Sequence, residues 1–174
     1  MEKQPEETNE EEIARQNGVT PLVSGKMVQF GPGVAARVSA EQDVAMTRSM
    51  AVVVAAGQDM EMKQSRAQMV AVGRDMKVTD GSTLIASVGN DIKSENSFNM
   101  LLNASGNVDL VDCLTPVLVG SQVTAGKSVI GLVLSRQTNL GDGSQVLLNT
   151  PQAVALGACF GVVFAVVSWL LKRK

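Results

Sequence analysis

The sequence predicts an all-β protein: a single-chain β-solenoid of about eight sixteen-residue rungs, followed by one C-terminal transmembrane α-helix. Three observations carry this prediction. The motif Gly-x-Asp followed by Met or Ile occurs at Gly57, Gly73 and Gly89, at a spacing of sixteen residues. Apolar residues recur at fixed places in this unit through residues 25–150. An uncharged stretch of nineteen residues, Ala153–Leu171, comes near the end of the chain.

The sixteen-residue period indicates one supersecondary unit stacked on copies of itself, because neither the helical period of 3.6 nor the strand period of 2 explains it. In each unit, pairs of apolar residues two apart alternate with small or polar residues, which is typical of strand, turn, strand, turn. Eight rungs stacked about 4.8 Å apart would make a rod about 38 Å long. Without a gap, the rungs begin at Gly25, Glu41, Gly57, Gly73, Gly89, Ser105, Ser121 and Gln137.

The turns are expected at the first and third positions of each rung. Glycine at position one permits a backbone with positive φ, and Asp at position three suits the entry into a strand. The Asp residues at position three form a row: Asp43, Asp59, Asp75 and Asp91. Such a row of carboxylates is a candidate calcium ladder, or a set of turn residues screened by water. The Gly-Gly-x-Gly-x-Asp pattern of calcium-binding β-rolls is absent from the sequence.

The residues at position thirteen predict an interaction surface. They differ in parity from the apolar residues at positions twelve and fourteen, so they point outward if those two point inward. Small residues at positions eleven and fifteen would make this outer face flat, with a contiguous apolar ridge that monomers rarely expose. The predicted ridge consists of Val53, Met69, Ile85, Leu101, Val117 and Val133. Coverage by the N-terminal segment, or an opposite parity, is the alternative.

Residues 1–24 are expected to form a disordered acidic tail, because this Glu-rich stretch has too little apolar surface to offset chain entropy. The tail is also a candidate contact for another protein. The domain boundaries expected from the sequence are 25–150 for the solenoid, 151–171 for the membrane anchor and 172–174 for a basic tail.

The segment Ala153–Leu171 would span about 28 Å as a helix, close to the thickness of a bilayer core. Trp169 and the Lys-Arg-Lys end suit a membrane interface. Small residues four apart would let such helices pack closely: Ala153, Gly157, Gly161 and Ala165. Together with the ridge they predict a parallel homo-oligomer, a trimer or a dimer, with the lipid bilayer as a further partner.

The composition argues against several functions. A net charge of −2 and 3% aromatic residues give no basis for binding nucleic acid. The chain has no His, which removes the commonest general base, so we expect neither an enzyme nor a cofactor. Cys113 and Cys159 are expected to be free thiols in a reducing compartment.

A small β-solenoid with Val-, Gly- and Ala-rich rungs and a disordered tail resembles the bactofilins, bacterial cytoskeletal proteins that form polymers. This resemblance covers residues 25–150 and implies a scaffold at the inner membrane. Two features depart from it: the strict sixteen-residue rung with Gly-x-Asp turns, and an anchor at one end of the rod, where end-to-end growth would need a free edge.

The sequence therefore predicts a non-enzymatic, tail-anchored scaffold that self-associates side by side, with its solenoid in the cytoplasm. The alternative is an exported spike or adhesin-like binding module anchored at its C-terminus. The basic end favours export by the positive-inside rule, whereas the charged N-terminus does not read as a signal peptide.

Overall fold

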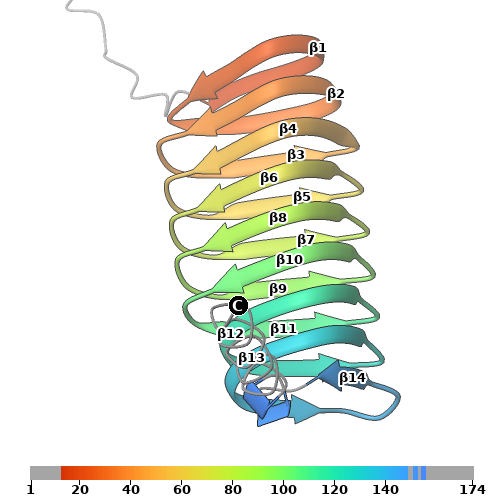
Figure 1. Cartoon of the computed structure of the whole chain (residues 1–174). Coiled ribbons are helices and arrows are strands. Elements are labelled where there is room, and N and C mark those ends of the chain that lie inside the picture. Colours follow the sequence, from red (N-terminus) through yellow and green to blue (C-terminus); the bar gives the residue numbers. More distant parts are fainter. Residues whose placement is uncertain (1–12, 149–150, 153, 156–174) are drawn as a thin grey trace, which may run out of the picture.

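The computed structural model describes residues 13–148, 151–152 and 154–155. In this part of the chain fourteen strands pair in parallel into one continuous stack (Figure 1). The strands are β1 (Ile13–Gly25), β2 (Met27–Ala40), β3 (Val44–Thr47), β4 (Ser49–Ala56), β5 (Met60–Lys63), β6 (Arg66–Val72), β7 (Met76–Thr79), β8 (Ser82–Val88), β9 (Ile92–Glu95), β10 (Phe98–Ala104), β11 (Asn107–Val111), β12 (Leu114–Gly126), β13 (Val129–Leu140) and β14 (Gln145–Leu148).

The strands form a parallel β-solenoid of about eight turns, which confirms the all-β prediction. Through the middle of the stack each coil contributes one short strand and one longer strand, and each strand pairs with its counterpart in the next coil. Toward the ends a single long strand takes the place of both: β2 pairs with β3 and β4, and β12 pairs with β10 and β11. The short strands β3, β5, β7 and β9 therefore line one side of the stack, and β4, β6, β8 and β10 line the other (Figure 1).

The solenoid begins earlier than the sequence predicted. Strand β1 starts at Ile13 and pairs with β2, so the boundary of the expected disordered tail at residue 24 is wrong. The sixteen-residue frame hid this strand, because its pairing is shorter: Gly18 lies beside Gly33 and Leu22 beside Arg37. A backbone edge offered by β2 provides hydrogen-bond partners that the composition of the tail does not reveal.

The register is sixteen residues through the middle of the stack, where Val54, Val70 and Ala86 lie beside one another in turn. The gapless alignment fails after Asn103, because the next coil has only fifteen residues. Asn103 still pairs with Val119 at sixteen, whereas Leu114 pairs with Val129 at fifteen. Every position after this coil is therefore shifted by one residue relative to the predicted frame.

The core is a set of side-chain rows inside the coil. Positions four, six, fourteen and sixteen alternate with exposed neighbours, as strand geometry requires. Fully buried Met, Leu and Ile side chains stabilise the fold by roughly 1.5–3 kcal/mol each. The largest of these buried residues are Phe30, Met46, Met60, Met62, Met76, Ile92, Leu102, Leu110, Leu118 and Ile130.

The corner after each short strand is built from position eight, not from the glycine at position one. All six residues there have φ near +50°: Arg48, Gln64, Asp80, Asn96, Asp112 and Lys127. The glycines at position one have no positive φ; a Cβ on Gly73 or Gly89 would instead lie 2.1 Å from the carbonyl oxygen of the preceding coil. Close backbone approach, and not a left-handed conformation, requires glycine at this place.

The longer strands bend at position twelve. Position eleven is buried, and positions twelve and thirteen both face outward, as at Val52 and Val53. The pairing skips position twelve, since Ala51 lies beside Ala67 and Val53 beside Met69. The prediction that twelve points inward and eleven outward is therefore wrong: the predicted flat face is a corner, which strict alternation along a straight strand cannot produce.

Beyond β14, residues 151–152 and 154–155 are helical. Within the described ranges no helix is long and apolar enough to span a bilayer. The predicted anchor lies almost wholly outside these ranges, as does the basic tail at 172–174.

Candidate interaction surface

The two sides of the solenoid differ in their outward-facing chemistry. On the side of β3, β5, β7, β9 and β11, the outward residues of position five are Ala45, Glu61, Lys77, Lys93 and Asp109. Ion pairs such as Lys63–Glu61 and Lys93–Glu95 lie on this side. We call it the charged side.

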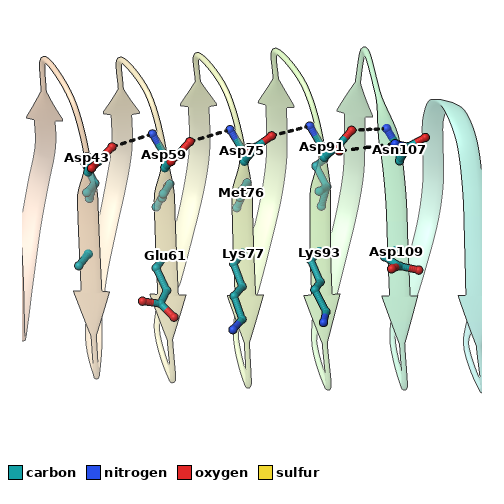
Figure 2. Close-up of a pocket in the computed structure, with 14 residues that line it drawn as sticks. Asp43, Asp59, Glu61, Asp75, Met76, Lys77, Asp91, Lys93, Asn107 and Asp109 are labelled. Carbon is teal, nitrogen blue, oxygen red and sulfur yellow. Dashed lines mark hydrogen bonds between the residues drawn. The ribbon is translucent and has the colours of Figure 1, made fainter.

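The aspartate row lies along the charged side. Its carboxylates accept hydrogen bonds from backbone N–H groups. In Figure 2, each carboxylate bonds to the next coil. Asp43 Oδ1 accepts from the backbone N–H of Asp59 at 3.0 Å, and Asp75 Oδ1 from that of Asp91 at 3.1 Å. The row continues to Asn107, whose backbone N–H donates to Asp91 Oδ1 at 2.6 Å. Each carboxylate therefore provides a hydrogen-bond partner for a backbone N–H group in the turn of the neighbouring coil.

Asp59 has an additional partner. The Arg74 guanidinium donates to both of its carboxylate oxygens, through Nε at 2.8 Å and through Nη2. This hydrogen bond lowers the pKa of Asp59 below its usual value and raises that of Arg74. Arg74 thereby relieves part of the repulsion between stacked carboxylates.

A groove of about 630 Å³ runs between the aspartate row and position five, from Asp43 to Asp109 (Figure 2). Among the described residues no group of three or more His, Cys, Asp or Glu side chains is arranged to hold a metal ion. The hydrogen bonds that the candidate calcium ladder Asp43, Asp59, Asp75 and Asp91 accepts from the next coil are those expected of turn residues.

The other side carries the predicted ridge, and most of its members face outward. Met69 is 53% exposed and Ile85 is 46% exposed. Val53, Leu101 and Val117 are half-buried in the same row. Val133 is fully buried and does not belong to the ridge. Because of the fifteen-residue coil, Leu132 lies beside Val117 and takes the place predicted for Val133.

The bend adds exposed apolar residues that the sequence analysis did not assign to the surface. Val52, Leu84 and Met100 at position twelve are exposed beside the ridge. Positions twelve and thirteen together form an apolar corner along the rod. Both positions are apolar in the sequence, which is consistent with this corner. Strict alternation along a straight strand, however, assigned position twelve to the core. A further exposed row lies at position ten and includes Met50, Phe98, Leu114 and Val129.

The predicted small-residue face of the anchor is not placed by the structure. Ala153, Gly157, Gly161 and Ala165 lie outside the described residues. Cys113 is buried as a free thiol, with Sγ 3.3 Å from the carbonyl oxygens of Ser94 and Val111.

No family model, curated protein or solved structure matches the chain. The resemblance to bactofilins therefore rests on the parallel solenoid architecture of about eight turns.

Proposed function

We propose that this protein is a non-enzymatic scaffold that is anchored in a membrane and self-associates side by side through the apolar corner. The observation that carries the proposal is the contrast between the two sides of the rod. One side exposes Met69, Leu84, Ile85 and Met100 over successive coils, and the other exposes carboxylates and lysines. A contiguous exposed apolar row is typical of a protein contact surface.

The membrane part of the proposal rests on the uncharged segment Ala153–Leu171 and the basic residues after it. In this proposal the solenoid lies in the cytoplasm. The exported, C-terminally anchored binding module is the competing topology. Protease treatment of intact cells distinguishes them, because an exported rod is cleaved and a cytoplasmic rod is protected.

Self-association is tested by native mass spectrometry of the full-length protein in mild detergent, beside the variant Ile85→Lys. A lysine at this exposed place leaves the coil folded but places a charge in the contact, so we expect a shift from oligomer to monomer. Loss of about 2 kcal/mol or more at such a position would weaken association more than 25-fold.

Thr124→Lys is the matched control, because Thr124 is an exposed strand residue on the charged side. It should keep the oligomer of the unmodified protein. Circular dichroism of both variants verifies the fold. A monomer for the unmodified protein, or equal effects of the two substitutions, would overturn the proposal.

A further inference from the structure

The apolar corner separates two outward rows that differ in size. On one flank, position ten carries mostly large side chains: Val34, Met50, Arg66, Ser82, Phe98, Leu114 and Val129. On the other flank, position fifteen carries small side chains in the first four coils, Ser39, Ala55, Ala71 and Ser87, and larger ones in the last three, Asn103, Val119 and Leu134. We call these the large flank and the small flank. Because the longer strand bends between them, they face different directions.

Over the first four coils, this difference makes the two flanks complementary to each other and not to themselves. There, two large flanks in contact would bring Met50 against an equally large side chain, and two small flanks would leave a gap. Packing a large flank on a small flank fills the space, as close-packed interfaces require. Contact between unlike surfaces is heterologous, so it continues from copy to copy until it closes into a ring.

Charges at the outer borders of the flanks indicate the direction and register of this contact. Position eight borders the large flank and carries Arg48 in one coil and Asp80 two coils later. Positions one and two border the small flank, where the same two coils carry Glu41 and Arg74. All four residues are exposed, and Arg74 is also paired with Asp59 of its own chain. Parallel rods in register therefore place opposite charges together.

Other alignments lose this match. A shift by one coil would place Arg48 beside Gln58 or beside Lys26, and Asp80 beside Asn90 or Gln58. The one coil between the two charged coils is neutral on both borders in the in-register arrangement, with Gln64 beside Gln58, and so is the next, with Asn96 beside Asn90. Asp112, one coil further on, meets only Ser105 and Gly106.

We propose that copies of this chain assemble as parallel, in-register solenoids around the apolar corner, with the large flank of one copy against the small flank of the next. This arrangement rests on the proposed self-association and specifies its geometry. The parallel direction puts strand β14 of every copy at the same end of the assembly. The angle at the bend sets how many copies close the ring.

The available area favours a ring over an isolated pair. The seven strands β2, β4, β6, β8, β10, β12 and β13 carry the two flanks. At about 4.8 Å between strands and about 3.3 Å per residue, one four-residue flank covers roughly 450 Å². One contact buries one flank of each partner, roughly 450 Å², which is below the about 800 Å² per partner of a standard stable interface. A ring gives each copy two such contacts, roughly 900 Å² in total, whereas an isolated pair has only one.

The test is disulfide cross-linking of the full-length protein in mild detergent, in a Cys159→Ser background. Met50→Cys and Ala55→Cys lie in the same coil, one on each flank. Co-expressed with tags of different mass, they should cross-link to each other, and neither should cross-link to itself. Met50→Cys with Ser87→Cys is the matched control, since Ser87 lies on the small flank two coils away and should not react.

Native mass spectrometry of the same samples distinguishes a failure of self-association from a failure of the proposed arrangement of flanks. A monomer would overturn self-association itself. An oligomer in which Met50→Cys links to its own kind, or in which the Met50 and Ala55 variants do not link, would overturn only the arrangement of flanks. A heterotypic link confined to the same coil supports it.

Discussion

At the scale of single residues, the corner at position eight selects for a backbone conformation that few side chains tolerate. Asn and Asp adopt positive φ more readily than other residues, because their short side chains can bond locally. Asp80, Asn96 and Asp112 fit this requirement, whereas Gln64 with φ of +50° does not. The solenoid holds Gln64 in place through its neighbours, since its backbone N–H donates to the Thr79 carbonyl at 3.0 Å.

Gln64→Asn should therefore stabilise the protein by about 0.5–1 kcal/mol, because asparagine relieves part of the left-handed strain. The midpoint of urea denaturation measures this effect. Gln68→Asn is the control, since Gln68 is exposed in a strand, where asparagine brings no gain. An unchanged or lower midpoint for Gln64→Asn would show that the corner does not strain glutamine.

Three buried polar residues at position eleven are a second feature at this scale. Thr83, Asn99 and Thr115 are all fully buried in successive coils. In the described part of the chain, Thr83 Oγ1 and Thr115 Oγ1 have no hydrogen-bond partner, nor does Asn99 Oδ1. A buried hydroxyl without a partner costs free energy relative to an apolar group of the same shape.

Thr83→Val should raise the free energy of unfolding by about 1 kcal/mol, because it removes an unpaired hydroxyl and preserves the side-chain shape. Chemical denaturation gives this value. The matched variant Thr79→Val, outside the core in β7, should have a smaller effect. Destabilisation by Thr83→Val would mean that a buried water satisfies the hydroxyl.

At the scale of elements, polar rows connect one coil to the next at both turns of the coil. Ser65 Oγ donates to the Lys63 carbonyl at 2.8 Å and accepts from the Ser49 backbone N–H at 3.2 Å. Ser97 and Ser128 repeat this arrangement. The aspartate row does the same at the other turn. Strand pairing and turn side chains therefore specify the same sixteen-residue stacking.

The ion pair between Arg74 and Asp59 predicts a pH-dependent contribution at this scale. The pKa of Asp59 is lowered in the folded protein, so the pair stabilises the fold above the unfolded pKa of about 3.8. This contribution disappears as the pH falls through the lowered pKa. Urea denaturation should show Arg74→Gln less stable than the unmodified protein at about pH 6 and equally stable well below the lowered pKa, where Asp59 is protonated.

The pair is exposed, so added salt should also reduce the difference at pH 6. Lys77→Gln is a suitable control, because Lys77 occupies the next short strand of the same charged side. A difference between Arg74→Gln and the unmodified protein that persists with Asp59 protonated would show that Arg74 acts through packing.

At the scale of the whole molecule, each coil contacts its two neighbours and nothing more distant, so the outward rows are the features that a second copy can recognise. Charges at the borders of the flanks should then act between copies. Arg48→Glu should weaken the oligomer several-fold, because it faces Glu41 of the adjacent copy in the proposed ring. Exposed ion pairs contribute about 0.2–1 kcal/mol, and a ring contains one such contact for every copy.

The double variant Arg48→Glu with Glu41→Arg should restore association, since the opposite charges meet again between copies. Dilution series by mass photometry in detergent measure both effects. Weakening by the single variant without recovery in the double variant would contradict the pairing of these two residues.

Much of the fold could be predicted from the sequence, because a repeated core leaves a repeated pattern. Val44, Met60 and Met76 at position four are buried side by side, as the sixteen-residue period requires. What failed were the departures from the repeat. Strand β1 has no sixteen-residue alignment, although Val23 and Ser24 correspond to Val38 and Ser39 fifteen residues on.

The candidate surface was predicted in part for a related reason. Met69 and Ile85 are exposed, but the bend beside them could not be derived from alternation, because two successive outward residues break it. Val133 was assigned to the surface by counting through a coil that is one residue short. The change of register from sixteen to fifteen residues is seen only in the strand pairing of the structure.

The short coil has a consequence for how the chain finds its structure. In a stack of similar coils, a shift of the pairing by one whole coil replaces Gly73 by Gly89 and Met60 by Met76. Most contacts are kept, so the shifted arrangement costs little free energy. Across the fifteen-residue coil the same shift would bring Val133 to the outside and Leu132 to the inside. This single missing residue therefore acts as a positional landmark that distinguishes correct threading from near-identical misfolded alternatives.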